Sequence, residues 1–448
     1  MNLKRVGALL LAGAMAVSAV GCGGSSDDKK EGKKGNAEGI GKVGDELIKD
    51  AKLSVYVPQG KNENFIKKAA EIYNESTGAN IELEITNITP GSATTQQLSP
   101  KLVSGEQLPD IIFIQDMSVA GLLEQFPDGF ASATDYGFYK EYGDQFLEAK
   151  VDTLNQVSGG EAKGFPMDWG SVVAYYQIEA FEKAGIKYED IKSWDELIEA
   201  GKVIKEKTGM NLMTLNETGE VELLLVLMEQ QGVSLLDEEG NINIATKEGK
   251  KAMEIIQRLI DEDLVTFYAG DNQEAMYQEV ALFMTGGWYA SNMEANFPDA
   301  KGKWCVSKVI PFSEEDPGYN PISGGSSWYI GGNAKNGAAA AQFLTFAMTD
   351  EKALEAAIEL SVVSSNKNAY QSEAANKEFE FYNNQKLNLI FNEANEASKG
   401  TNLFSTIGDA RAYAAAATYD AWNSGDGDKA LEKAAEDFAA KHNVKVNK

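Results

Sequence analysis

The residue types that most often perform catalysis or bind metals are scarce in this chain. Its 448 residues include one histidine, His442, and two cysteines, Cys22 and Cys305. A single histidine largely removes histidine-based metal sites and the serine–histidine or cysteine–histidine pairs that activate a nucleophile. The two cysteines are too few and too far apart in the sequence to form a disulfide framework. We therefore expect no metal or other cofactor, and we predict that Cys305, in the alternating run "KGKWCVSKVI", is a buried structural thiol.

Acidic side chains at the ends of apolar runs are the first candidates for a binding site. Asp116 ends "LPDIIFIQD", and Asp168 follows "GFPM"; both runs are typical of buried strands. Carboxylates there can accept hydrogen bonds from a ligand. Helix capping or turn formation is the alternative for both aspartates.

Aromatic side chains beside glycine turns are the second group of candidates. Trp169 precedes a glycine, Trp288 and Tyr289 follow "TGG", and Trp328 follows "SGGSS". Turns lie at surfaces or clefts, where an aromatic face can stack on the apolar face of a ligand. Packing in the core is the alternative for each of them. Trp194, Trp304 and Trp422 are interpreted as packing residues.

The N-terminal cysteine lies in a secretion signal. "MNLKRVGALLLAGAMAVSAVGC" has a basic start and an apolar run too short to span a bilayer. Small residues before Cys22 make it similar to the bacterial lipobox, with Ala19 where leucine is commonest. We predict a signal peptide over 1–21, thioether lipidation of Cys22, and a flexible tether over 22–49 that is rich in Gly, Ser and Lys. The alternative is an ordinary exported protein with an accidental cysteine.

Length and charge limit the class of protein and its partners. The chain exceeds the usual size of a single core, so two lobes are expected. The formal net charge is -27, and an acidic surface repels phosphate backbones. Nucleic acid is therefore excluded as an expected partner.

The elements that must position these residues form an α/β pattern. From residue 50, apolar runs typical of strands alternate with segments of helical spacing, which predicts a parallel-rich sheet with crossover helices. Ligands of such sheets lie beyond the carboxyl ends of the strands. This directs attention to Gln59, Asn62 and Glu63 after the first strand. Asp409 and Arg411 open a later helix, where pairing within the helix or solvent exposure is the alternative to ligand binding.

The order of these motifs resembles a known family. "LVSGEQLPDIIFIQD", "GFPMDWGSVVAYYQIEAFEKAGI", "KSWDELIEAGKVI", "ALFMTGGWYAS" and "ISGGSSWYIGGNAKNGAAAAQFLTFAMTDEKA" are similar, in order and spacing, to the extracellular sugar-binding proteins of bacterial ABC importers. These are the family 1 solute-binding proteins. One departure is Gln177, where the family usually has asparagine.

The resemblance implies an α/β, two-lobed type II periplasmic-binding-protein-like fold with an interlobe ligand cleft and hinge. It places the first lobe at 50–166 and 310–365, and the second lobe at 167–309 and 366–448. It also implies a carbohydrate, such as an oligosaccharide, bound between the lobes. The expected ligand-binding residues are Trp169, Trp288, Tyr289, Trp328, Asp116, Asp168, Gln59, Asn62, Glu63, Asp409 and Arg411.

The resemblance further implies partners and a location. The partners would be a separate ABC permease and its ATPase, and the protein would be a monomer, held at the outer face of the cytoplasmic membrane by the lipid on Cys22 alone. A receptor of the same fold for a non-sugar solute is the first alternative. An extracellular carbohydrate-active enzyme is the second, although the sequence shows no GxSxG or HExxH signature. No enzymatic activity is expected.

Overall fold

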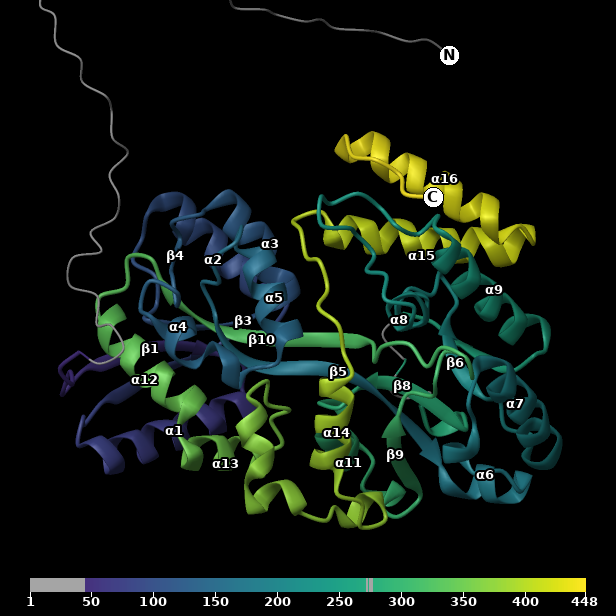
Figure 1. The fold of residues 1–448 in the computed structure, drawn as a ribbon, viewed down its shortest axis with the longest axis horizontal. Helices are drawn as coiled ribbons and strands as arrows, with labels where there is room; N and C mark the ends of the chain where they lie inside the picture. Colours follow the sequence, from purple (N-terminus) through teal and green to yellow (C-terminus); the bar gives the residue numbers. More distant parts are fainter. Residues whose placement is uncertain (1–44, 271–272, 274–276) are drawn as a thin grey trace, which may run out of the picture. The chain divides into compact units, whose positions relative to one another are not determined.

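The computed structural model describes residues 45–270, 273 and 277–448 (Figure 1). The predicted signal peptide, Cys22 and residues 22–44 of the predicted tether therefore lie outside the described residues. The last residues of that predicted tether lie against the folded part. Ile48 N donates to Gln342 Oε1 at 3.0 Å, and Gln342 Nε2 donates to Glu46 O at 2.9 Å.

Ten strands and fifteen α-helices are described. The strands are β1 (Lys52–Val57), β2 (Glu82–Asn87), β3 (Ile111–Gln115), β4 (Phe130–Ala131), β5 (Phe165–Gln177), β6 (Met213–Asn216), β7 (Val265–Tyr268), β8 (Leu282–Gly286), β9 (Trp304–Lys308) and β10 (Ile322–Gly331). The helices are α1 (Lys61–Thr77), α2 (Ser92–Ser104), α3 (Asp116–Gln125), α4 (Phe138–Tyr142), α5 (Glu148–Val157), α6 (Ile178–Ala184), α7 (Trp194–Thr208), α8 (Glu222–Gln230), α9 (Lys247–Asp261), α11 (Tyr289–Asn296), α12 (Gly337–Thr349), α13 (Glu351–Glu359), α14 (Leu387–Glu396), α15 (Ile407–Ser424) and α16 (Gly427–His442).

One sheet runs through most of the molecule in the order β2-β1-β3-β10-β5-β8, with β4 on β10 and β9 on β5. Pairing is parallel among β1, β2 and β3, as the βαβ spacing predicts. Pairing of β10 with β3, and of β5 with β10, β8 and β9, is antiparallel. The parallel part is therefore smaller than the sequence pattern indicated.

The long strand β5 connects the two halves of the sheet (Figure 1). Its first half pairs with β10, with Phe165 opposite Trp328 and Trp169 opposite Gly325. Its second half pairs with β8 and β9, from Val172 to Gln177. We call the elements β1–β4, β10, α1–α5, α12 and α13 the first lobe, and β6–β9, α6–α9, α11 and α14–α16 the second lobe. The residue-level lobe boundaries expected from the sequence stay a prediction.

Alternation along the strands of the first lobe separates its two hydrophobic layers. Ile111 and Phe113 of β3 pack with α1 and α12, while Ile112 and Ile114 pack on the opposite face with α2 and α3. Such a strand is buried on both faces, which explains the continuous apolar run "IIFI". The polar residue that follows this run is consequently fixed at the edge of a well-packed sheet.

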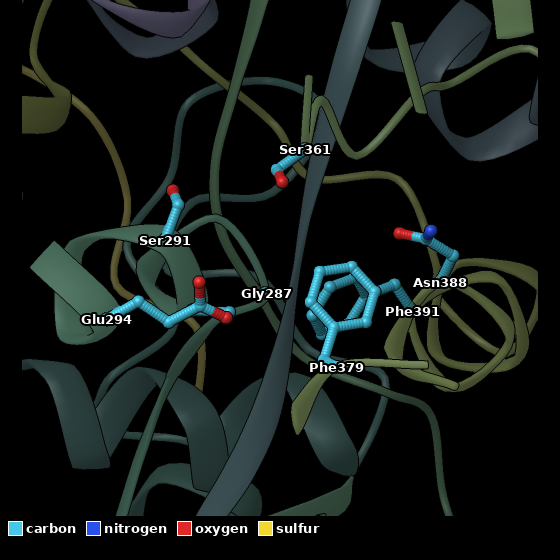
Figure 2. Close-up of a pocket in the computed structure, with 8 residues that line it drawn as sticks. Gly287, Ser291, Glu294, Ser361, Phe379, Asn388 and Phe391 are labelled. Carbon is cyan, nitrogen blue, oxygen red and sulfur yellow. The ribbon is translucent and has the colours of Figure 1, made fainter. Parts of the chain in front are cut away.

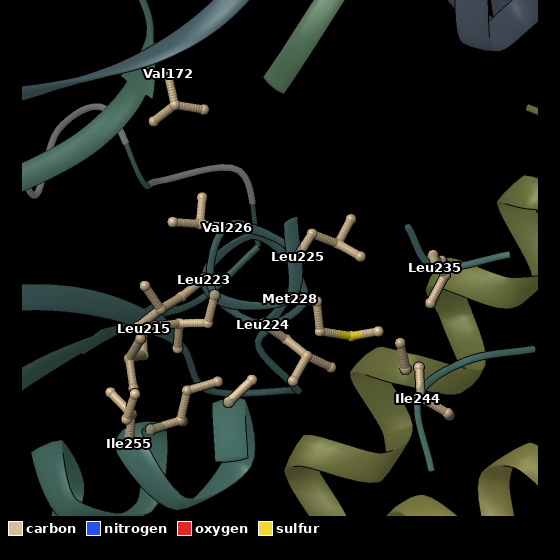
Figure 3. Packing of buried hydrophobic residues seen from close by; sticks show 14 of the residues in the cluster. Val172, Leu215, Leu223, Leu224, Leu225, Val226, Met228, Leu235, Ile244 and Ile255 are labelled. Atoms are coloured by element: carbon tan, nitrogen blue, oxygen red, sulfur yellow. The ribbon is translucent and has the colours of Figure 1, made fainter. Parts of the chain in front are cut away.

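The second lobe is built around α8, whose sequence "ELLLVLMEQ" is apolar on all sides (Figure 3). A helix of this kind has no solvent face and is buried within a core. Leu224, Leu227 and Met228 are fully buried there. Trp194 and Trp304 are each 1% exposed and Cys305 is buried, so their prediction as core residues is confirmed. No helix in the described part of the chain is long and apolar enough to cross a membrane.

Candidate functional site

Four of the predicted site residues converge on one short segment, Ser323–Ser327, at the start of β10. The indole Nε1 of Trp288, which follows β8, donates to Ser323 O at 2.9 Å. Asp116, at the start of α3, accepts from Ser327 Oγ at 2.8 Å. Asp168 and Trp169 lie on β5 opposite Ser326 and Gly325. This segment therefore joins side chains from both lobes.

Glycine is required in this segment for steric reasons. Gly324 and Gly325 have φ angles of 110° and 125°, which L side chains rarely adopt. A Cβ on Gly325 would lie 2.8 Å from Asp116 Oδ2 and 3.2 Å from the Trp169 ring. The "SGG" sequence thus permits Asp116 and Trp169 to approach the backbone of β10, and the β5–β10 pairing shifts register at this point.

A buried ion pair fixes Asp116. Lys150 on α5 has no exposed side-chain surface, and its Nζ forms an ion pair with Asp116 and donates to Ser326 O at 2.9 Å. The same ammonium lies 5.5 Å from the centre of the Trp169 ring. Asp116 therefore has internal partners on both carboxylate oxygens. A direct contact between Asp116 and a ligand stays a prediction.

Asp168 differs from Asp116 because its carboxylate is not fully paired. Its Oδ1 is buried and has no hydrogen-bond partner among the described residues. Burial raises the pKa of the Asp168 carboxyl, and the ammonium groups of Lys150 and Lys61 counteract part of that effect. Lys61, in the first turn of α1, donates one long hydrogen bond of 3.5 Å to Ser361 O. Burial lowers the pKa of Lys61, which the Asp168 carboxylate partly offsets.

Further buried oxygens in the described part of the chain have no hydrogen-bond partner, among them three on α1, β5 and α14. They are Asn62 Oδ1, Ser171 Oγ and Asn395 Oδ1. Asn62 follows Lys61, and Ser171 lies three residues after Asp168 on β5. Asn395 donates to Ser364 O at 3.3 Å, and Ser364 pairs with Asp168 across an isolated β-bridge. We call Asn62 Oδ1, Asp168 Oδ1, Ser171 Oγ and Asn395 Oδ1 the open acceptors.

The open acceptors are energetically costly as they stand. A buried polar atom without a partner costs about 1–3 kcal/mol, and native proteins contain few of them. These four oxygens, on α1, β5 and α14, are available to a ligand with hydrogen-bond donors. The sequence pattern indicated Asn62 and Asp168 but gave no signal for Ser171 or Asn395.

The predicted aromatic residues separate into two groups. Trp288 is partly exposed, whereas Trp169 is 1% exposed and donates from Nε1 to Ser398 Oγ at 2.8 Å. Tyr289 packs edge-on against Tyr175 in the second-lobe core. Trp328 is fully buried in the first-lobe core with its ring centre 5.4 Å from Phe113. Tyr289 and Trp328 thus lie in the core. Packing in the core was the alternative to ligand binding for both residues.

The remaining predicted residues near the first strand have separate surroundings. Gln59 is exposed, at the turn after β1. Glu63 accepts from Lys67 Nζ at 2.5 Å and from Asn87 Nδ2 at 2.8 Å. These interactions lower the pKa of Glu63, the Lys67 hydrogen bond most of all. Neither residue lies among the open acceptors.

The two predicted residues on α15 form ion pairs with other helices. Asp409 lies 2.5 Å from Lys441 Nζ and 2.9 Å from His442 Nε2, both on α16. Arg411 pairs with Glu222 at the start of α8. Asp409 and Arg411 therefore pair with residues of other helices. The alternative to ligand binding that the sequence suggested was different: pairing within one helix, or exposure to solvent.

A pocket that the sequence did not indicate lies next to Trp288 (Figure 2). It is small, with a free volume of about 10 Å³, and Gly287 and Ser361 lie at its wall. Gly287 is the neighbour of Trp288, and Ser361 is the residue whose carbonyl accepts from Lys61. The lining residues are Gly287, Ala290, Ser291, Glu294, Ser361, Phe379, Asn388 and Phe391.

A larger depression of about 400 Å³ lies elsewhere, at the C-terminal ends of α2 and α3. Asp116 begins α3, so the ten residues of that helix, about 15 Å, separate it from this depression. Its lining includes none of the predicted site residues or open acceptors. Within the described residues, no group of three or more His, Cys, Asp or Glu side chains is placed to hold a metal ion.

Comparison with known proteins adds a family and a fold. The model of a family described as bacterial extracellular solute-binding protein matches residues 68–382. The lactose-binding protein of Rhizobium radiobacter is 31% identical over 278 residues, which cover 60% of this chain and 63% of that protein. The arabinooligosaccharide-binding protein of Halalkalibacterium halodurans is 26% identical over 323 residues, or 70% of this chain and 71% of that protein.

Solved structures support the fold independently. The sugar-binding protein MalE from Xanthomonas citri superposes with a TM-score of 0.72 at 16% identity, over 88% of this chain and 98% of that chain. At this identity the likeness concerns the fold alone. It confirms the predicted two-lobed α/β fold.

Proposed function

The chain belongs to the bacterial extracellular solute-binding proteins, which confirms the predicted family and an extracytoplasmic location, and we propose that its solute is a carbohydrate. The protein captures this carbohydrate between its two lobes and delivers it to the permease of an ABC importer. The family and the compared proteins are binding proteins, and the proposed role requires no catalytic step.

The observation that carries this proposal is the set of open acceptors beside two tryptophans. Sugar hydroxyls are hydrogen-bond donors that can satisfy Asn62, Asp168, Ser171 and Asn395, which lack donors in the described part of the chain. The apolar face of a sugar ring can stack on Trp288, which is partly exposed. An apolar solute would leave the acceptors unpaired, and an anionic solute would meet the Asp168 carboxylate.

The relatives support the same class of solute. Proteins similar to this chain are named for binding lactose and arabinooligosaccharide, and each is a carbohydrate with many hydroxyl groups. Which sugar this chain binds depends on the side chains around the open acceptors. We propose an oligosaccharide, because the polar and aromatic groups extend from Asp168 to the pocket beyond Trp288.

The proposal includes the anchoring and assembly of the protein. Lipid on Cys22 holds it at the outer face of the cytoplasmic membrane, and the predicted tether 22–49 links that lipid to the folded part. The lobes at 50–166 with 310–365 and at 167–309 with 366–448 close around the sugar by a hinge motion at the segments that connect them. The protein works as a monomer beside its permease and ATPase.

Calorimetry with a panel of purified oligosaccharides tests the proposed function. We expect saturable binding of at least one sugar, with the sugar recovered unchanged by chromatography after incubation. The Asp168→Asn variant keeps the shape of the side chain and should weaken that binding, while the Glu179→Gln variant on an exposed helix should not. Turnover of the sugar, or binding of none of the carbohydrates, contradicts the proposal.

A further inference from the structure

Asp168 and Lys61 are half-buried side chains of opposite charge that attach to the same short segment. Asp168 pairs with Ser364 across an isolated β-bridge, and Lys61 Nζ donates to Ser361 O at 3.5 Å. An extended chain advances about 3.3 Å per residue, so these two attachment points are at most about 10 Å apart. Burial lowers the pKa of Lys61, and the Asp168 carboxylate partly offsets this. The two charged groups therefore lie within electrostatic range of each other.

Neither of these two groups uses its full bonding capacity. The Oδ1 atom of Asp168 is buried and has no hydrogen-bond partner in the described part of the chain. The 3.5 Å bond of Lys61 is longer than an ordinary N–H···O bond of about 2.7–3.2 Å. A sugar hydroxyl both donates and accepts, so it is a neutral group that suits both: it can donate to the carboxylate and accept from the ammonium.

The charged groups that act on Asp168 balance one another. The ammonium groups of Lys150 and Lys61 attract its carboxylate, and the Asp116 carboxylate repels it. Lys150 forms an ion pair with Asp116, which leaves Lys61 as the counter-charge for Asp168. Two carboxylates and two ammonium groups thus give a net charge of zero. A ligand that brings a charge of either sign would leave one charge uncompensated away from water, which is strongly unfavourable.

We propose that Lys61 and Asp168 together form a charge filter, which admits neutral sugars and excludes amino sugars and uronic acids. An ammonium on the sugar meets the like charge of Lys61, and a carboxylate meets that of Asp168, whereas a hydroxyl bonds to both. The inference rests on the proposed function and deepens it, because it names neutral carbohydrates as the substrate class. The sequence pattern indicated Asn62 but not its neighbour Lys61, which becomes a residue that determines specificity.

Sugars that differ in a single charged group provide the test. The neutral parents are lactose, cellobiose and arabinobiose. One series replaces each hydroxyl in turn by an amine, and the other replaces a primary alcohol by a carboxylate; at about pH 6 the amines are cationic and the carboxylates anionic. Like charges placed together in a binding site are costly, so we expect at least about tenfold weaker binding for the uronate and for an amine at one or more positions. Calorimetry on the full-length protein without its lipid measures each dissociation constant.

Two substitutions should change the selectivity in opposite directions. Lys61→Gln keeps a donor but removes the charge, so the ligand's own ammonium can serve as the counter-charge for Asp168. We expect this variant to favour the excluded amino sugar at least about tenfold more than the wild type does, relative to the neutral parent. Asp168→Asn should favour the uronate in the same way. Lys68→Gln is the matched control, because Lys68 lies on the same helix α1, is exposed and pairs with Glu71 at 3.0 Å.

Each outcome bears on one proposal or the other. Equal wild-type affinity for the neutral parents and all their charged derivatives overturns the charge filter while carbohydrate binding stands. Wild-type selectivity in a folded Lys61→Gln variant does the same, as does an equal change of selectivity in Lys68→Gln. Thermal unfolding checks that each variant is folded, and the Lys61 variant decides alone if Asp168→Asn does not fold. Binding of no carbohydrate, neutral or charged, overturns the proposed function itself and the charge filter with it.

Discussion

Replacing Asp116 with alanine should destabilise the protein by about 3–5 kcal/mol, because it leaves the Lys150 ammonium buried without its counter-charge. Lys150 has no exposed surface, and its remaining hydrogen bond is to Ser326 O at 2.9 Å. Ser327 Oγ would also lose the acceptor that now lies at 2.8 Å. Neither group can reach solvent, so the loss is much larger than that expected for an exposed ion pair.

A double variant distinguishes an uncompensated charge from a simple loss of packing. Asp116→Leu with Lys150→Met replaces the ion pair by apolar groups, and such replacements are often neutral or stabilising. We expect the double variant to lie within about 2 kcal/mol of the wild type, the residual loss coming from the Ser327 hydroxyl and the Ser326 carbonyl, which lose their partners. The exposed pair Glu179–Lys183 is the control, since Glu179→Ala should leave the free energy of unfolding nearly unchanged.

Urea unfolding followed by tryptophan fluorescence at pH 7 gives the free energy of unfolding of each variant. The reasoning would be refuted if Asp116→Ala cost less than about 1 kcal/mol, or if the double variant were no more stable than Asp116→Ala alone. Sugar binding by the folded double variant then reports on the ligand contact predicted for Asp116. Retained affinity would assign Asp116 a purely structural role.

Three further predictions concern the aromatic face, the titration of the half-buried Glu229 and the anchor. Trp288→Ala should weaken sugar binding by about tenfold or more, since stacking on its ring is lost, and a folded variant with unchanged affinity in calorimetry removes Trp288 from the site. Burial raises the pKa of Glu229, which accepts from Ile322 N at 2.7 Å, to about 7. A carboxyl with a pKa above its unfolded value binds more protons when folded, so its contribution to stability is lost as pH rises from about 5 to about 8. Glu229→Gln, which can still accept from Ile322, should therefore show a smaller fall in the urea midpoint over that range, and an equal fall argues against this assignment. Cys22→Ser should move the protein from the membrane fraction to the medium, as followed by immunoblotting; retention in the membrane fraction counts against lipidation.

The fold was largely predictable because it follows from local patterns that span the whole chain. Runs such as "IIFI" indicate strands buried on both faces, and helical spacing between them indicates crossovers. The extent of antiparallel pairing was not predictable in the same way. It depends on β5 and β10, which run in opposite directions beside each other although about 150 residues of chain separate them.

The site was predictable only in part, because strand alternation decides which neighbours face the ligand. Ser327 and Trp328 are adjacent on β10, yet Ser327 bonds to Asp116 while Trp328 packs with Phe113 in the opposite layer. A shift of one residue reverses the two assignments, and the sequence contains no signal that fixes the face. Lys150 was missed for a related reason, since a lysine on a short helix is usually a surface residue.

The open acceptors give a physical reason for coupling between solute binding and closure. Each costs about 1–3 kcal/mol while it is buried without a donor, so a closed molecule without solute is penalised by all four together. In the proposed function, opening of the lobes would let water satisfy them, and a bound sugar would satisfy them with the lobes closed. The closed state would therefore become favourable only when hydroxyl donors of the right geometry are present. A solute that merely fills the space without donating would bind no better to the closed state than to the open one, and could not shift the equilibrium between them.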